Sequence, residues 1–412
     1  MVSVSLPPSF PQIEFHSGDV TTPNGFWADG VSANLRDSSL DMALLVSDGA
    51  AAFCGMFTTN AVRAAPVELT ERVHRRGTCH AVIVNSKNAN ALTGVRGRRD
   101  AEAMQAMVAE SLGVDSEEVA VASTGVIGLP LPMDLVQSGI EHLTARYHGG
   151  RPADGLAASH AILTTDTAVK SAAVTIQCAG GAVKIGMMVK GSGMIHPQMA
   201  TMLAFFTTDA AIERKRLERV LRGAVERSFH RISVDGDQST NDMVLIWANG
   251  RSGVAITGED DLALFEKGLT ELARYGARLI AADGEGATHL ITVRVTGATT
   301  EADAALKARA VVRSALVKTA VYGRDPNWGR VLAAAGTAGV PIEPVEVSLT
   351  MNGLPLYMRG EPVIGQDAVW SAAMDRPEIE FGLDVAQGAE SAEAYGCDLT
   401  EGYVEINARY RT

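Results

Sequence analysis

The sequence predicts an α+β protein with mixed sheets. Short apolar runs that end in Asn, Asp or Gly clusters dominate the first third of the chain, as expected for strands. After residue 200, amphipathic helical segments alternate with further strands. The length of 412 residues favours two lobes or one large core. Composition and rhythm change at residues 190–201, where we place a boundary.

The first third contains three segments with the apolar character of strands, 42–49, 51–59 and 80–90. The first segment with helical periodicity is 100–112, whose apolar residues repeat at spacings of three to four. Residues 119–132 then predict a strand that breaks into a loop rich in glycine and proline.

The second half predicts two long amphipathic helices, over 211–229 and 261–282. In the first, an apolar stripe of Leu217, Val220, Leu221 and Val225 opposes a charged face. The expected strands lie at 232–236, 242–250 and 289–297, and residues 345–360 predict a hairpin with Asn-Gly at its turn. The last residues alternate as a strand would, up to Thr412.

The composition excludes several classes of partner. A net charge of −12 and an aromatic content of 5% disfavour nucleic acid and anionic membrane surfaces, although an acidic protein can still bind a small anionic substrate. Four scattered cysteines predict buried free thiols and no zinc site. Neither a signal or transit peptide nor a run of about 18 apolar residues is found, so we expect a cytoplasmic protein without a membrane span.

The segment KGSGMIHPQMATMLAFFTTDA, residues 190–210, allows two interpretations. It is a loop that enters a buried strand, or it is a site where the chain cleaves itself between Ala200 and Thr201. Cleavage would free the α-amine of Thr201, whose ordinary pKa of about 7.7–8.0 lets it act as the base for its own hydroxyl. On spacing alone, the loop and strand are favoured.

Four further stretches each allow a functional and a purely structural interpretation. STGVIG (123–128) forms an oxyanion hole or an ordinary turn. Glu285, in ADGEGATHL (282–290), holds an ammonium group or is solvated. SVDGDQSTND (233–242) resembles an acidic metal loop but lacks the terminal Glu of a calcium site, so we reject a metal there. VYGRDPNWGR (321–330) favours a structural corner over a carboxylate site.

Taken together, these stretches resemble the ornithine acetyltransferases, also called glutamate N-acetyltransferases. The resemblance covers nearly the whole chain, and the segment around Thr201 is highly specific to that family. The matching segments are MFTTNAVRAAPV (56–67), NANALTG (88–94), STGVIG (123–128), ILTTDT (162–167), residues 190–210, DGDQSTND (235–242), DGEGAT (283–288), LVKTAVYGRDPNWGR (316–330) and YGCDLTEGYVEINARY (395–410).

The resemblance implies self-cleavage into an α chain of residues 1–200 and a β chain of residues 201–412. It implies that Thr201 takes the acetyl group of N2-acetylornithine and passes it to glutamate, with acetyl-CoA as a further donor in some members. The implied fold is a two-sheet sandwich between helices with a smaller α+β C-terminal lobe. The implied assembly is a dimer of αβ units.

By the same matches, Thr201 is the nucleophile, and Thr124 and Gly125 form the oxyanion hole. The implied substrate contacts are Thr164, Lys190, Glu285, Asn407 and Thr412, besides Thr201 itself. Neither a cofactor nor a metal is implied.

Four residues depart from the usual family pattern. Lys87 stands where glycine is usual, Leu92 where cysteine is common, Gln198 for asparagine and His289 for lysine. They leave open a paralogue that acts on another N-acyl amino acid in a specialised pathway. The residues also leave open an N-terminal-nucleophile aminopeptidase or amidase, which would pass the acyl group to water, and a non-catalytic binding protein.

Overall fold

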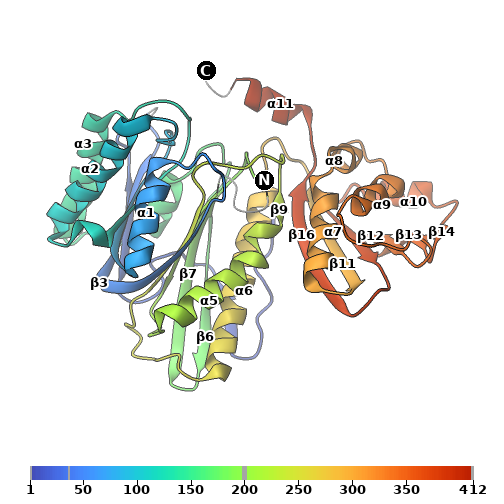
Figure 1. Cartoon of the computed structure of the whole chain (residues 1–412), viewed down its shortest axis with the longest axis horizontal. Coiled ribbons are helices and arrows are strands. Elements are labelled where there is room, and N and C mark those ends of the chain that lie inside the picture. The colour runs from blue at the N-terminus through green and yellow to red at the C-terminus, as the bar shows by residue number, and fades with distance from the viewer. Residues whose placement is uncertain (1, 36–37, 197–201, 410–412) are drawn as a thin grey trace.

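The protein has two lobes, each built on its own sheet. The structure, a computed structural model, describes residues 2–35, 38–196 and 202–409. Figure 1 shows the larger lobe, which holds the first part of the chain, beside a smaller C-terminal lobe. The α+β class, the two sheets and the smaller C-terminal lobe are as the sequence predicts.

The sheet of the larger lobe has nine strands. β8 pairs in parallel with β10, and β4 with β5, while the other neighbours are antiparallel. In spatial order the strands are β1 (Ile13–His16), β6 (Lys170–Cys178), β7 (Gly181–Lys190), β8 (Leu203–Thr208), β10 (Met243–Ala248), β3 (Met42–Phe57), β4 (Thr78–Asn85) and β5 (Val119–Ser123), with β2 (Phe26–Val31) paired to β3.

The long strand β3 joins the two halves of this sheet. Its first half pairs with β2 and β4 and its second half with β10, and its register with β4 shifts between Val46 and Ala51. The two strands expected at 42–49 and 51–59 are therefore one bent strand. Because β3 is continuous, the nine strands of the larger lobe form a single hydrogen-bonded sheet, and the second sheet belongs to the smaller lobe.

Helices cover both faces of the large sheet. Since successive strand residues point to opposite faces, Phe53 enters one apolar core and Cys54 the other. The first core receives α1 (Ala65–Arg76), α2 (Gly94–Leu112), α3 (Met133–His148) and α4 (Gly155–Ala161), and the second receives α5 (Arg214–Glu226) and α6 (Glu259–Ala282). The predicted apolar stripe of α5 is buried as expected. Single 3-10 turns lie at Ser116–Glu118 and Phe229–Arg231.

The sheet of the smaller lobe has seven strands and packs against its own helices. Asn352 and Gly353 both have positive φ, as the predicted Asn-Gly hairpin requires. The strands in order are β14 (Glu361–Pro362), β13 (Leu354–Met358), β12 (Ser348–Met351), β15 (Glu378–Asp384), β11 (Leu290–Ala298), β16 (Glu390–Cys397) and β9 (Ile232–Ser233), and the helices are α7 (Glu301–Arg313), α8 (Ala315–Tyr322), α9 (Trp328–Gly336) and α10 (Asp367–Ala373).

The last described segment differs from the sequence prediction. Instead of a strand it forms α11 (Glu401–Ala408), which buries no residue and lies apart from both sheets at the top of Figure 1. The sheet ends earlier, with β16 at Cys397, so the alternation beyond it has no strand to pair with.

The compositional change at 190–201 does not separate the lobes. β7 and β8 lie on either side of it and pair within one sheet. The chain first adds the edge strand β9 to the sheet of the smaller lobe, returns to the larger sheet as β10, and builds the rest of the smaller lobe from β11 onward. Among the described residues, no helix is long and apolar enough to cross a lipid bilayer.

Candidate active site

A cavity of about 200 Å³ brings together residues that are distant in the sequence. Five of the predicted site residues line it, from separate parts of the chain: Thr124, Gly125, Thr164, Glu285 and Asn407. Loop residues from 193–194 and 239–241 complete much of its wall. The convergence of predicted residues on one small cavity identifies the candidate site.

Lys190, at the end of β7, lies behind the wall of this cavity. Its ammonium group is buried and donates to the hydroxyl of Thr164 at 2.8 Å and, more weakly, to that of Thr124 at 3.5 Å. Oδ2 of Asp166 lies 3.7 Å from the same Lys190 Nζ. Burial lowers the pKa of Lys190 below its usual value, although Asp166 opposes the shift. Lys190 therefore orients two cavity hydroxyls, and the sequence did not predict these contacts.

A buried ion network supports Lys190. Lys170 Nζ contacts a carboxylate oxygen of Asp166 at 2.7 Å and one of Asp283 at 2.6 Å, and all three side chains are buried. Asp166 also accepts the backbone N–H of Gly191 at 2.7 Å. Burial acts to raise the pKa of Asp166, but the two lysines outweigh it and hold that pKa below its usual range. The network anchors the loop that carries Thr164 through Asp166, which also accepts the Thr164 N–H.

The end of β5 presents two donors to the cavity. The N–H of Thr124 is already used, because it donates to the carbonyl of Asn85 at 3.0 Å. The hydroxyl of Thr124 and the N–H of Gly125 remain, and the latter has no partner among the described residues. Gly125 has φ +135°, and a Cβ there would lie 2.2 Å from the carbonyl carbon of Lys87. The backbone at this point requires glycine.

Glu285 lies in the loop between α6 and β11, as predicted. Its side chain is mostly buried, and Oε2 accepts a hydrogen bond from Asn407 Nδ2 at 2.7 Å. A Cβ at Gly193 would lie 2.3 Å from the carboxyl carbon of Glu285, so the glycine leaves room for that group. The contact with Asn407 ties α11 to the cavity, which local sequence patterns could not predict.

Asp242 anchors the strand that follows the predicted nucleophile. Its Oδ1 accepts the N–H of Met202 at 2.8 Å, and Met243 donates its N–H to the carbonyl of Met202 at 3.3 Å. The N–H and the carbonyl of Met202, the residue after Thr201, are therefore both hydrogen-bonded. Burial keeps the pKa of the Asp242 carboxyl well above its usual range. In the sequence, Asp242 belongs to the rejected metal loop and to the matching segment DGDQSTND, and neither assigned it a role.

Three of the unusual residues fit their positions without removing a cavity group. Lys87 has φ +72°, a left-handed conformation that explains why glycine is usual there. Leu92 is exposed and also has a positive φ. His289 is buried against Asp398, with Nδ1 and Oδ2 3.0 Å apart.

The predicted cleavage site lies outside the described residues. Ala200, Thr201, Gln198 and Thr412 all belong to the segments that the structure does not describe. Within residues 2–35, 38–196 and 202–409, no group of three or more His, Cys, Asp or Glu side chains could hold a metal ion. The four cysteines are free and buried.

Comparison with known proteins decides the family. The model of the ArgJ family matches residues 27–412. The chain belongs to the ArgJ family. The "Arginine biosynthesis bifunctional protein ArgJ" of Symbiobacterium thermophilum is 48% identical over 405 residues, which cover 97% of this chain and all of the relative. The ArgJ protein of the same name from Bacillus subtilis is 44% identical over 404 residues, covering 97% and 98%.

Solved ArgJ structures are also similar. The arginine biosynthesis bifunctional protein ArgJ of Bacillus halodurans is 39% identical, covers 50% of this chain and 97% of its own, and has a TM-score of 0.48. The ornithine acetyltransferase of Mycobacterium tuberculosis, solved in complex with ornithine, is also 39% identical, covers 45% and 98%, and has a TM-score of 0.41. The family model and the curated relatives confirm the family membership expected from the sequence.

Proposed function

We propose that this enzyme of arginine biosynthesis moves an acetyl group from N2-acetylornithine to glutamate through an acetyl ester on Thr201. Its relatives at 44–48% identity bear the name of the arginine biosynthesis bifunctional protein. The observation that carries the proposal is the cavity where the Thr124 hydroxyl, the Gly125 N–H and the Glu285 carboxylate meet.

The chain would first process itself. Thr201 Oγ attacks the carbonyl carbon of Ala200, the C–N bond to Thr201 breaks, and water hydrolyses the resulting ester. The products are residues 1–200 and residues 201–412, and the new α-amine can accept the proton of the Thr201 hydroxyl. The pairing of β7 with β8 supports the two chains staying together, and we propose that two such αβ units form a dimer in the cytoplasm.

Acetyl transfer would then take two steps. Thr201 Oγ attacks the acetyl carbon of N2-acetylornithine, the amide C–N bond breaks, and ornithine leaves with a proton. The α-amine of glutamate attacks the acetyl-enzyme, and its N–C bond forms as the Thr201 ester bond breaks. Each step develops negative charge on the acetyl oxygen, and donors fixed in advance stabilise such charge. The Thr124 hydroxyl, held by Lys190, and the Gly125 N–H are those donors.

We propose that Glu285 selects the donor substrate. N2-acetylornithine carries a free side-chain ammonium group, and a mostly buried carboxylate on the cavity wall is suited to hold it. Asn407 fixes one oxygen of that carboxylate and leaves the other available to substrate. Thr164 lines the same cavity, and we propose that it contacts the substrate. For Thr412, a substrate contact is proposed from the family resemblance alone.

The variant Glu285→Gln should raise the KM for N2-acetylornithine about ten- to hundredfold, because a charge-assisted hydrogen bond of about 1.5–3 kcal/mol is lost. Steady-state kinetics with each substrate varied in turn measure this. Glu405→Gln is a matched control, since Glu405 is exposed on α11 and contacts Arg409. An unchanged KM in Glu285→Gln would remove this residue from donor recognition.

The variant Gly125→Ala should lower kcat about 10²- to 10³-fold, the usual cost of losing one oxyanion donor. The added Cβ would collide with the backbone of Lys87, and L residues rarely adopt this φ. Gly336→Ala is the control, because a Cβ there meets open space. Comparable kcat values in the two variants would contradict the role given to Gly125.

The experiment that tests the proposed function measures ornithine release from N2-acetylornithine with and without glutamate. A transferase requires the acceptor for continued turnover, so release should stop after about one equivalent when glutamate is absent. Equally fast release without glutamate would instead identify an amidase that passes the acetyl group to water. Acceptance of another N-acyl amino acid in preference would identify the specialised paralogue.

A further inference from the structure

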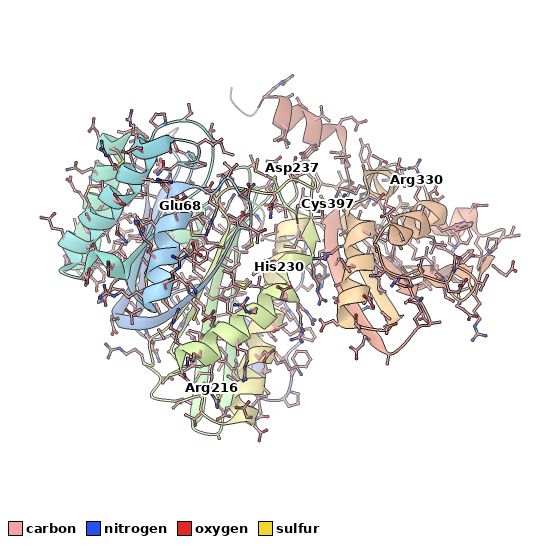
Figure 2. All side chains as sticks on the ribbon, in the orientation of Figure 1. Glu68, Arg216, His230, Asp237, Arg330 and Cys397 are labelled. Atoms are coloured by element: carbon pink, nitrogen blue, oxygen red, sulfur yellow. The ribbon has the colours of Figure 1, made fainter. Side chains whose placement is uncertain are left out.

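A second and larger cavity, of about 980 Å³, lies where the helices of the smaller lobe face two loops of the larger one. Its wall carries Arg309 and Arg313 of α7 and Arg330 of α9, with His196 and Gln238 from the larger lobe. Figure 2 labels Arg330 on the smaller lobe and Asp237, next to Gln238, in the facing loop. We name this cavity the arginine groove. None of its described lining residues is acidic.

The three arginines of the groove lack carboxylate partners. Most arginines among the described residues lie within 4 Å of a carboxylate, but Arg309, Arg313 and Arg330 pair with none. Arg330 donates to the carbonyl of Leu316 at 2.9 Å, and Arg309 to that of His230 at 3.5 Å. Arg313 hydrogen-bonds to no described residue. Their positive charges are therefore left for a ligand.

The acidic residues near the groove do not line it. Glu226, the acid that acts on Arg309, is already paired with His230 at 3.1 Å. Burial and the two arginines of α7 lower the pKa of His196, although Asp237 opposes the shift. The chain has a net charge of −12, whereas this cavity carries the positive charge of three arginines without carboxylate partners.

The groove also has an apolar wall. Ala310, Ala333 and Ala334 and the side chain of Leu306 line it between α7 and α9, beside Ala315 and Leu316 of α8. Small side chains leave a smooth surface on which a flat or extended apolar group can lie. The cavity thus combines charge for an anion with room for a larger organic part.

We propose that the arginine groove binds a small molecule that carries phosphate or diphosphate groups. Guanidinium groups match phosphate oxygens with paired, charge-assisted hydrogen bonds, and three of them converge on one cavity here. Arg313 and Arg330 contact the phosphates, and Arg309 contributes charge from the depth of the groove.

The groove adjoins the acetyl-transfer cavity. His196 and Gln238 line the groove, while Met194 and Ser239, one or two residues away, line the smaller cavity. The same two segments of the chain therefore contribute to both cavities. If the proposed acetyl transfer is correct, an acyl-coenzyme A donor is one source of the phosphate groups. A free phosphate or nucleotide effector is the other.

Equilibrium titration calorimetry on the wild-type protein tests the inference without requiring turnover, so its outcome is independent of the proposed reaction. The probes are coenzyme A, adenosine 3′,5′-bisphosphate, pyrophosphate and citrate. We expect the phosphate-bearing probes to bind and to compete with one another, and citrate to bind at least about tenfold more weakly.

Arg313→Ala and Arg330→Ala should each weaken phosphate-probe binding about tenfold or more. Arg99→Ala, an exposed arginine on α2 with no described ion pair, is the matched control.

Each result is decisive. Coenzyme A binding more tightly than the bisphosphate and pyrophosphate supports the acyl donor as the ligand, whereas equal affinities support a free phosphate ligand. The inference is overturned if no phosphate probe binds, if citrate binds as tightly, or if Arg313→Ala and Arg330→Ala bind as Arg99→Ala does. Circular dichroism of each variant establishes that its fold is retained before binding is compared.

Discussion

Replacement of Thr201 by alanine is expected to abolish both chain cleavage and acetyl transfer. The same hydroxyl would attack the Ala200 carbonyl once and the acetyl carbon in every later turnover, so no other group can replace it. Loss of a nucleophile costs on the order of 10⁴-fold or more in kcat. Denaturing electrophoresis should show a single band near 43.3 kDa in place of two fragments of about half that mass.

The matched variant Thr201→Ser keeps a hydroxyl at the same position and should retain measurable cleavage and transfer. The pair thus separates loss of the nucleophile from loss of local packing. A Thr201→Ala protein that is still cut between residues 200 and 201, or that still transfers acetyl groups at a rate near wild type, would refute the assignment.

Replacement of Lys170 by methionine is expected to have the largest effect on stability. Lys170 contacts both Asp166 and Asp283 and is fully buried, so its loss leaves two carboxylates in the interior with less compensating charge. Breaking such a buried pair costs about 3–5 kcal/mol in free energy of unfolding. Urea denaturation followed by circular dichroism measures the change.

Lys215→Met provides the control for this experiment. Lys215 is an exposed residue of α5, so the substitution should change the free energy of unfolding by less than about 0.5 kcal/mol. A similarly small change in Lys170→Met would show that the network does not stabilise the fold. Because Asp166 also holds the Gly191 N–H, we expect residual acetyl transfer in Lys170→Met to be reduced as well.

The parts of the fold that depend on local pattern could be predicted from the sequence. The Asn352-Gly353 turn follows from the need for two positive φ values, and the stripe on α5 from helical periodicity. The loop position of Glu285 follows from its flanking glycines. The end of the chain could not be predicted in this way, because alternation indicates a strand only where a partner strand is available.

The candidate site could be predicted only as a set of residues. Local patterns left Thr124 and Glu285 ambiguous, and resemblance to a family supplied their roles. Neither could reveal that Asn407 meets Glu285, 122 positions earlier, because that contact depends on how α11 folds back over the loops. The contacts from Lys170 through Asp166 to Lys190 likewise depend on the antiparallel pairing of β6 with β7, which brings the start of β6 beside the end of β7.

The three-dimensional arrangement also sharpens two roles. The resemblance assigned Thr124 to the oxyanion hole without saying which group acts, and the bond from its N–H to Asn85 leaves the hydroxyl as the available donor. Lys190 was expected to contact substrate directly. That contact stays a prediction, and the structure adds that the Lys190 ammonium group donates to the hydroxyls of Thr124 and Thr164.

The central claim is that Thr201 becomes an N-terminal residue and then carries the acetyl group. An intact-mass spectrum of the purified protein, recorded before and after addition of N2-acetylornithine without glutamate, tests it directly. We predict two chains, residues 1–200 and 201–412, and a gain of one acetyl group on the second chain alone. A single uncut chain that gains no mass would contradict the account.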